Sequence, residues 1–293
     1  MIHEKYKIDF EQGTSVLHRL TKEGNNKVIF LIHGYFEDSK IFYSKSGKGF
    51  GPYLVDQGYD VFLCDILGKG ESTPKIANGF KHSQFEIITR DIPTYVKKVK
   101  DISGADKINL GGHSWGGVVL LAYMARKKDT SIKSIITFGT KRRIARKNLR
   151  KLININIGWT WYGNRLVEKY GYLPAKQMKM GNSDESKEYY KQADVWVREK
   201  VWIDPEDGFD YHQNFNFQLP PILFITGKGD KILGHPKDVK ILANELGNAS
   251  YEYKTIGVDS GHLHNYDHIN LLTHKDAPND HFNLVLDFLE KFN

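Results

Sequence analysis

Residues 112–116 read Gly-His-Ser-Trp-Gly, a spacing typical of a serine nucleophile held on a tight turn. The motif lies between an apolar run typical of a strand and a second apolar run typical of a buried helix. So sharp a turn brings Gly112 and Gly116 close together, and both are small enough to allow it. At the start of the helix, the backbone N–H of Trp115 could stabilise the oxyanion formed when Ser114 attacks a carbonyl. The pattern also fits a glycine-rich turn whose serine only caps the helix.

A nucleophilic serine needs a base, and the base needs an acid that orients it. In an open parallel sheet, such groups gather beyond the carboxyl ends of the strands. Asp230 follows the apolar run 219–226 in a tight Gly-Lys-Gly-Asp loop, so it is favoured as the acid over Asp259 and Asp267. With a histidine after it, the chain order is serine, aspartate, histidine, which matches hydrolases built on such a sheet.

The candidate base lies in a histidine-rich stretch near the C-terminus, where His262 and His268 are the two alternatives. The pattern of residues alone does not separate them. So many imidazoles beside aspartates could also hold a metal ion, but no H-E-x-x-H or comparable ligand spacing appears. We therefore expect no metal and no cofactor. The five histidines of this stretch are His262, His264, His268, His274 and His281.

The elements that must position these groups alternate between strand and helix, which predicts an α/β fold with a doubly wound parallel sheet. A further strand, over 14–22, is expected at the edge of the sheet. Pro93 is expected to kink or begin the second helix. The predicted buried strands are 27–32, 59–64, 108–110, 134–138, 219–226 and 250–256, and the predicted helices are 50–57, 82–99, 118–123, 237–246 and 280–292.

The alternation stops between residues 140 and 218, a stretch rich in aromatic residues. We interpret 1–139 and 219–293 as one α/β core, and 140–218 as a cap inserted over the sheet. The aromatic side chains would then line an apolar substrate pocket or pack the cap onto the core. Four of the five tryptophans lie in this stretch: Trp159, Trp161, Trp196 and Trp202.

Composition describes an ordinary globular protein, with 293 residues, 40% of them hydrophobic and 26% charged. The net charge of +7 is concentrated in part in 140–151, which holds seven lysines or arginines and no acid. We interpret this segment as a solvated basic face and expect no nucleic-acid binding, because no nucleic-acid-binding motif accompanies it. No apolar run reaches the ~18 residues of a membrane helix, so no membrane insertion is expected. The N-terminus lacks a signal-peptide pattern and Cys64 is the single cysteine, which favours the cytoplasm. The oligomeric state does not follow from the sequence.

The chain resembles serine hydrolases of the α/β-hydrolase fold, of the esterase and lipase kind. The resemblance covers essentially all of the chain outside 140–218, and it implies a mostly parallel sheet with a helical cap. Its matching pieces are His33-Gly34, the glycine-punctuated turn 65–72, the motif 112–116, the loop 227–230 and the C-terminal histidine stretch.

This resemblance implies a role for individual residues. Residues 266–278 are similar to a form in lipase-like members, where the catalytic histidine opens an H-x-D-hydrophobic pattern followed by Ala-Pro. Matched residue by residue, the base is His268, although Asn270 stands where that pattern has an acid, which keeps His262 as the alternative. The second oxyanion donor is implied to be the N–H of Tyr35, beside that of Trp115.

The resemblance implies a carboxylic ester hydrolase in which Ser114, His268 and Asp230 act through an acyl-enzyme. The expected substrate is a small-molecule acyl ester, and an aromatic-lined apolar site favours a medium-chain or aryl ester. Two alternatives stay open. The same nucleophile could serve an acyltransferase or a thioesterase, or the chain could be a non-catalytic binder with this fold.

Overall fold

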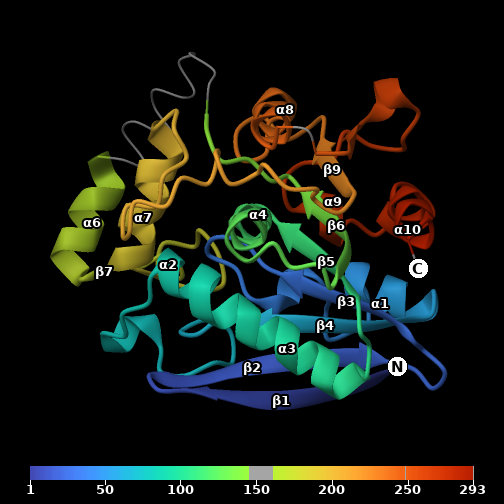
Figure 1. Ribbon diagram of the computed structural model, residues 1–293, viewed down its shortest axis with the longest axis horizontal. Helices are drawn as coiled ribbons and strands as arrows, with labels where there is room; N and C mark the ends of the chain where they lie inside the picture. The colour runs from blue at the N-terminus through green and yellow to red at the C-terminus, as the bar shows by residue number, and fades with distance from the viewer. Residues whose placement is uncertain (145–160, 248, 293) are drawn as a thin grey trace.

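The computed structural model describes residues 1–144, 161–247 and 249–292 (Figure 1). Its centre is an eight-stranded sheet in the order β1-β2-β4-β3-β5-β6-β9-β10. The strands β1, β2 and β4 are joined by antiparallel pairing, and every other neighbouring pair is parallel. The expected α/β fold with a mostly parallel sheet is therefore confirmed. The strands are β1 (Ile2–Phe10), β2 (Gly13–Thr21), β3 (Lys27–Ile32), β4 (Tyr59–Asp65), β5 (Ile108–His113), β6 (Ile132–Phe138), β9 (Ile222–Gly227) and β10 (Tyr251–Ile256).

The predicted edge strand was misplaced. The segment expected at the edge forms β2, which pairs with β1 on one side and β4 on the other, so the edge is β1. The sequence of β1, IHEKYKIDF, has charged residues along it and is exposed or half-buried except at Ile8. An outermost strand buries little, and for that reason it lacks the apolar run that marked the other strands.

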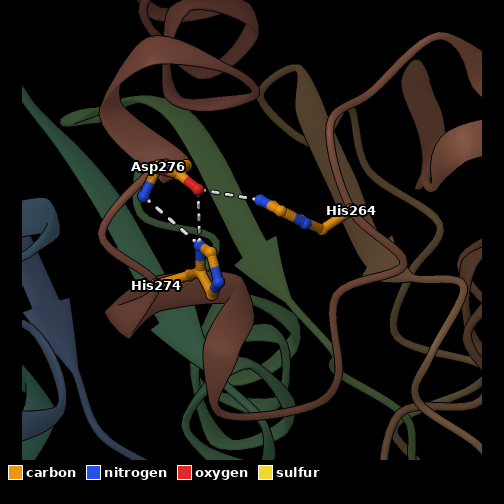
Figure 2. Close-up of side chains that lie close together, drawn as sticks. All are labelled: His264, His274 and Asp276. Carbon is orange, nitrogen blue, oxygen red and sulfur yellow. Dashed lines mark hydrogen bonds and ion pairs between the residues drawn. The ribbon is translucent and has the colours of Figure 1, made fainter.

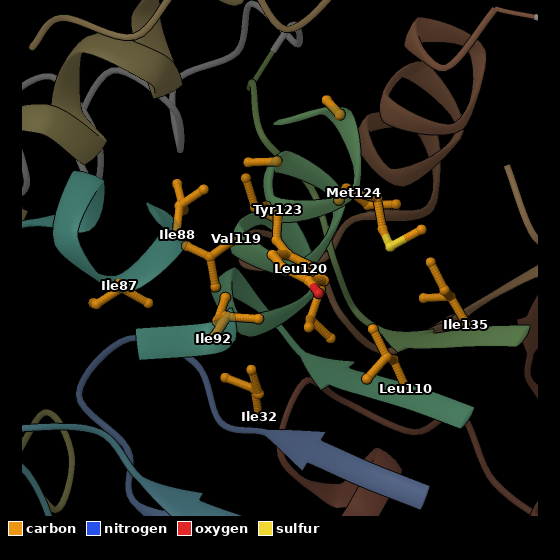
Figure 3. Packing of buried hydrophobic residues seen from close by; sticks show 14 of the residues in the cluster. Ile32, Ile87, Ile88, Ile92, Leu110, Val119, Leu120, Tyr123, Met124 and Ile135 are labelled. Carbon is orange, nitrogen blue, oxygen red and sulfur yellow. The ribbon is translucent and has the colours of Figure 1, made fainter. Parts of the chain in front are cut away.

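One face of the sheet is covered by α3 (Ile92–Ser103), α4 (Trp115–Lys127) and α8 (Pro236–Glu245), whose apolar side chains share a buried cluster with β3, β5 and β6. Figure 3 shows side chains of α4 packed between the strands and the start of α3. The predicted helix 82–99 is α2 (Gln84–Glu86), a π-helical turn (Ile87–Asp91) and α3. Pro93 lies in the first turn of α3, directly after the π-helical turn, so the helix continues through it with its regular hydrogen-bond pattern interrupted at that point.

The other face is covered by α1 (Phe50–Asp56) and α10 (Phe282–Glu290), with the short α9 (Asn270–Thr273) beside them. This second cluster of buried side chains includes residues of β9 and β10. Among the described residues, no helix combines the length and apolar character that crossing a bilayer requires. Single 3-10 turns form at η1 (Ser39–Ile41), η2 (Ile76–Asn78), η5 (Val258–Ser260) and η6 (Ala277–Asn279).

Between β6 and β9 the described chain forms α6 (Gly163–Tyr170), a two-stranded ribbon of β7 (Tyr172–Leu173) and β8 (Glu185–Ser186), and α7 (Lys187–Arg198). Trp196, Trp202 and Tyr211 are buried in the same cluster as α4, whereas Trp161 is 57% exposed. Trp159 and residues 145–151 of the predicted basic segment lie outside the described residues.

Candidate active site

Ser114 lies between β5 and α4 in a backbone conformation that few serines adopt, with φ 52° and ψ −122°. A positive φ at a residue with a Cβ costs free energy and persists only where the surroundings impose it. The N–H of Ser114 donates to the carbonyl of Phe138 at 2.8 Å, which attaches the turn to the end of β6. The side chain is half-buried, so the hydroxyl belongs to the surface of a cavity and not to the core.

The glycines around Ser114 are required by close backbone contacts. A Cβ on Gly112 would lie 2.5 Å from the N of Gly117, and one on Gly116 would lie 2.6 Å from the carbonyl O of His33. Real Cβ atoms do not approach that closely, so any larger residue would push the turn away from β3 and α4. The steric demand inferred from the motif is therefore present at both positions.

His268 and Asp230 meet although 38 residues separate them: Nδ1 of the imidazole lies 2.6 Å from Oδ2 of the carboxylate. Asp230 follows β9, His268 precedes α9, and both are almost completely buried. Burial opposes ionisation of Asp230, but the bond to His268 outweighs it and the pKa of the carboxyl is lowered. A carboxylate that accepts Nδ1–H leaves Nε2 as the basic nitrogen of the ring.

The other candidates from the sequence are engaged elsewhere. His262 Nδ1 lies 2.7 Å from Oδ1 of Asp280. Asp259 forms an ion pair with Lys228 at the surface. The carboxylate of Asp267 accepts the N–H of Asn270 at 2.7 Å and so caps the start of α9. The structure thus brings His268, and not His262, to Asp230.

The loop after β3 lies directly against Ser114. A Cβ on Gly34 would lie 2.7 Å from the Cβ of Ser114, so the backbone leading into Tyr35 touches the serine. Phe36, the next residue, has a positive φ of 61°, and its N–H donates to Oε1 of Glu185 at 2.9 Å. Glu185 of β8 therefore helps to fix the shape of the loop expected to supply an oxyanion donor.

Two residues that the sequence analysis passed over connect these pieces. His113 Nδ1 lies 2.8 Å from Oε2 of Glu37, and His113 Nε2 lies 3.0 Å from the carbonyl O of His268. The same carboxylate oxygen accepts the N–H of Gly34 at 2.7 Å. His113 occupies a position of the motif where any residue is allowed, so the motif did not indicate a role for it. Glu37 is 76 residues away from His113 in the chain, and its only signal in the sequence was that it closely follows His33-Gly34.

The pKa values of this pair shift in opposite directions. Burial disfavours the charged form of each group, but the Glu37 carboxylate outweighs it at His113 and raises the pKa of the imidazole. At Glu37 burial is likewise outweighed, chiefly by His113, and the pKa of the carboxyl is lowered. The two groups therefore form a buried ion pair that joins the loop after β3 to the motif and to the backbone of His268.

The loops after β3 and β4 are joined by His33 and Asp65. Burial lowers the pKa of His33, and its Nε2 accepts the N–H of Ile66 at 3.4 Å. The carboxylate of Asp65 accepts the N–H of Ser39 at 2.9 Å and that of Glu71 at 2.6 Å. Both side chains point to backbone groups, so their role is to shape the loops around the serine.

A cavity of about 1340 Å³ opens beside the serine, and Ser114, Trp115, Tyr35 and His268 all line it. Its volume exceeds the ~300–1,000 Å³ usual for small-molecule sites. Of its basic lining residues, Arg142 is bound by Glu245 and by the carbonyl O of Trp196, so it serves the structure. The apolar lining comes mainly from the segment between β6 and β9 and from two flanking loops: Trp161, Tyr162, Leu166, Leu173, Met178, Met180, Ile232, Leu233 and Ile269.

Within the described part of the chain, one group of side chains has the composition of a metal site. His264, His274 and Asp276 place three ligand atoms within 4.8 Å of one another (Figure 2). None of the three is among the described residues that line the cavity. The group therefore lies apart from the serine and its partners.

Comparisons with known proteins agree on the fold. The family model for the alpha/beta hydrolase fold matches residues 27–269. A protein of Schizosaccharomyces pombe named as a probable lipase is 29% identical over 136 residues, which cover 41% of this chain but only 29% of that protein. A thermophilic esterase from Thermogutta terrifontis superposes with a TM-score of 0.60 at 16% identity, covering 99% of both chains. The thioesterase domain from the curacin biosynthetic pathway superposes with a TM-score of 0.56 at 15% identity, covering 98% of this chain and all of that domain. At such identities the two structures show a shared fold alone.

Proposed function

The chain belongs to the alpha/beta hydrolase fold family, and from that premise we propose that it is a serine hydrolase that cleaves carboxylic esters through an acyl-enzyme. The observation that carries the proposal is the short His268–Asp230 contact, because His268 lines the same cavity as Ser114. The strained backbone of Ser114 and the touching loop after β3 support it as well. Asp230 follows β9 and His268 lies in the loop between β10 and α9, so two separate segments bring these groups together at the cavity that Ser114 lines.

In the proposed reaction, Oγ of Ser114 attacks the ester carbonyl carbon while Nε2 of His268 takes the hydroxyl proton. The carboxylate of Asp230 holds the imidazole in place and stabilises the imidazolium that forms. The N–H groups of Trp115 and Tyr35 donate to the oxyanion, and losing one such donor typically costs ~10²–10³ in rate.

The tetrahedral intermediate then collapses, the C–O bond to the alcohol breaks, and the leaving alkoxide takes the proton from His268. Water attacks the remaining acyl-enzyme with His268 again as the base. A second tetrahedral intermediate releases the carboxylic acid and restores the hydroxyl of Ser114. The imidazole is thus neutral at the start and the end of each half-reaction.

We propose that 140–218 acts as a cap that supplies the acyl-binding surface. Support comes from the many apolar side chains of its described part that line the cavity, among them Trp161, Leu166 and Met178. A large apolar cavity lined by aromatic and aliphatic groups favours a medium-chain or aryl ester over a short, polar one. A p-nitrophenyl ester panel from acetate to palmitate measures this preference as kcat/KM against chain length.

Fluorophosphonate labelling is the direct test of the nucleophile, because the reagent forms a covalent bond to an activated serine. We expect one label per chain in the wild type and none in Ser114→Ala, with ester hydrolysis lowered at least ~10³-fold. Ser46→Ala, which removes an exposed serine, should label like the wild type. Labelling that persists in Ser114→Ala would remove this residue from its role.

Labelling together with a competition between water, alcohol and thiol acceptors separates the alternatives. An acyltransferase or thioesterase would label at Ser114 but would favour an alcohol or thiol acceptor over water, or a thioester over the matching oxygen ester. A non-catalytic binder would take no label while still binding an apolar ester analogue. No observation favours either alternative over ester hydrolysis. The fold does not decide between them, because solved structures with this fold include an esterase and a thioesterase domain.

A further inference from the structure

We infer that His264, His274 and Asp276 bind one divalent transition-metal ion, and that this ion ties together the two ends of the segment that carries His268. Nε2 of His264 lies 2.8 Å from Oδ2 of Asp276, and Nδ1 of His274 lies 3.7 Å from the same oxygen. Figure 2 shows one nitrogen of each imidazole facing the carboxylate oxygen of Asp276. The inference concerns a site outside the cavity and does not depend on the proposed hydrolysis.

The donor set is one that zinc prefers. Two imidazole nitrogens and one carboxylate oxygen are common protein ligands of Zn²⁺, while Ca²⁺ and Mg²⁺ take oxygen ligands. At metal–ligand lengths of ~2.0–2.1 Å, the corners of a tetrahedron are about 3.3 Å apart. The separations of 2.8 and 3.7 Å lie on either side of that spacing, and all three ligand atoms lie within 4.8 Å of one another, so side-chain rotations would have to draw them together around an ion. Water would complete the coordination.

The ring of Tyr266 packs against both imidazoles. The ring is buried and meets His264 edge-on at 5.6 Å and His274 edge-on at 5.5 Å between centroids. Its hydroxyl donates to Oδ2 of Asp280 at 2.8 Å, which fixes the ring in turn. Rings oriented by neighbours lose little freedom when a metal binds, which is how outer residues raise metal affinity.

Two features oppose binding, and both are weak. Nδ1 of His274 accepts the N–H of Asp276 at 3.2 Å, a long hydrogen bond that an ion on this nitrogen would replace. Lys275 is positively charged and adjacent in sequence, but its side chain is exposed and therefore screened by water. The carboxylate of Asp276 faces one nitrogen of each imidazole.

A metal ion bound at His264, His274 and Asp276 would stabilise the segment that carries His268. His264 lies before His268 in the chain, and His274 and Asp276 lie after it, beyond α9. An ion shared by the three closes a loop around the segment, whose middle is held by the bond from His113 to the carbonyl of His268. Cross-linking two chain points in the folded state stabilises it against unfolding.

Isothermal titration calorimetry with Zn²⁺, on untagged protein treated with a chelator and then dialysed, tests the site. We expect one equivalent bound with a micromolar dissociation constant, and at least ~10-fold weaker binding in His264→Ala and in Asp276→Asn. His212→Ala, which removes an exposed histidine elsewhere, should bind like the wild type. His268→Ala should also bind normally, which separates this site from the His268–Asp230 pair.

Thermal unfolding gives a second readout that needs no enzymatic activity. Zn²⁺ at ~100 times the wild-type dissociation constant should raise the Tm of the wild type by about 5 °C, and that of Asp276→Asn by about half as much or less, because its binding is at least ~10-fold weaker. Unchanged zinc affinity in both cluster variants, loss of binding in His268→Ala, or equal affinity for Ca²⁺ would each overturn the inference. So would the absence of zinc binding to the wild type.

Discussion

His268 differs from the other histidines of its loop in the carboxylate that it contacts. The partner of His268 is Asp230 at the end of a parallel strand, whereas the partner of His262 is Asp280, next to α10. His268 also lines the cavity with Ser114. A base must reach the serine and be held by an acid at once. His268 is held by Asp230 and lines the same cavity as Ser114, which supports it as the proposed base.

Replacing each histidine tests the assignment. His268→Ala should lower kcat/KM for a p-nitrophenyl ester by ~10³-fold or more, because removing one member of a triad leaves only the residual activity of the site. His262→Ala should change it less than tenfold. Steady-state kinetics and a thermal melt of both variants provide the measurement. A larger loss in His262→Ala, at an unchanged Tm, would move the role of base to His262.

Glu37 acts on the site through His113, so we assign it a positioning role. Glu37→Gln should lower kcat by ~10-fold or more with little change in KM, because binding surfaces remain while the backbone carbonyl of His268 loses a fixed partner. Glu37→Asp, which keeps the charge, should recover part of the rate. A variant whose KM rises while kcat is unchanged would show that Glu37 belongs to substrate binding.

The Glu37–His113 pair also predicts a pH window for stability. Glu37 has a pKa lowered from 4.5, so its contribution is present above about pH 4.5 and is lost as pH falls through the folded value. His113 has a pKa raised from 6.5, so its contribution is complete below about pH 6.5 and is lost as pH rises through the folded value. The difference in the free energy of unfolding between wild type and Glu37→Gln should therefore be largest between these limits. Urea titrations at pH 5.5 and pH 9 measure it, and equal differences at both would contradict the ion pair.

At the scale of elements, the turn between β5 and α4 depends on backbone atoms that nearly touch. β3 and α4 approach closely enough that Gly116 faces the carbonyl of His33 and Gly112 faces the N of Gly117. The strain at Ser114 is sustained because β3, β5 and α4 are buried against one another in a continuous apolar cluster.

Gly112→Ala should therefore lower the free energy of unfolding by about 1–3 kcal/mol or more, as overpacking does, and should lower activity with it. Gly104→Ala is the control: its added Cβ meets nothing within 4 Å, and only its φ of +71° opposes the change. That strain alone costs roughly 1–2 kcal/mol. Chemical denaturation compares the two. If Gly112→Ala is both active and no less stable than Gly104→Ala, the close packing of the turn is not required.

Cys64 lies near the carboxyl end of β4 and is fully buried, and burial raises the pKa of its thiol well above the ordinary value. Reaction with a thiol reagent needs the exposed thiolate. We expect no reaction of the native protein with DTNB over hours and one equivalent after unfolding in guanidinium. Rapid reaction of the folded protein would show that β4 opens readily.

At the scale of the whole molecule, the segment between β6 and β9 is attached to the core by ion pairs. Lys69 and Glu185 form one that is buried on both sides, and Arg126 pairs with Asp204 at 2.9 Å. Glu185 also accepts the N–H of Phe36, so one carboxylate ties the proposed cap to the loop after β3. Burial raises the pKa of Glu185 in spite of the opposing effect of Lys69.

Removing that carboxylate should affect both stability and catalysis. Glu185→Ala leaves the Lys69 ammonium buried without its partner, which typically costs about 3–5 kcal/mol. The loop that carries Tyr35 loses its anchor, so hydrogen exchange at residues 34–38 should rise and kcat should fall. Glu188→Gln, on the nearby surface of α7, should change stability by less than about 0.5 kcal/mol. Unaltered exchange in the loop of Glu185→Ala would mean that other contacts fix it.

The sequence by itself determined the alternation of buried strands and helices, because apolar runs and glycine-punctuated turns are local properties of the chain. It also determined the turn at Ser114, because the need for small residues at Gly112 and Gly116 arises within a motif of five residues. The position of Asp230 at a strand end likewise followed from the sequence. Only the tertiary structure decided which histidine meets Asp230, since five of them share one stretch and the choice depends on the path of the loop. The edge strand β1, the Glu37–His113 pair and the cluster of His264, His274 and Asp276 likewise depend on contacts between separate segments, which no local pattern encodes.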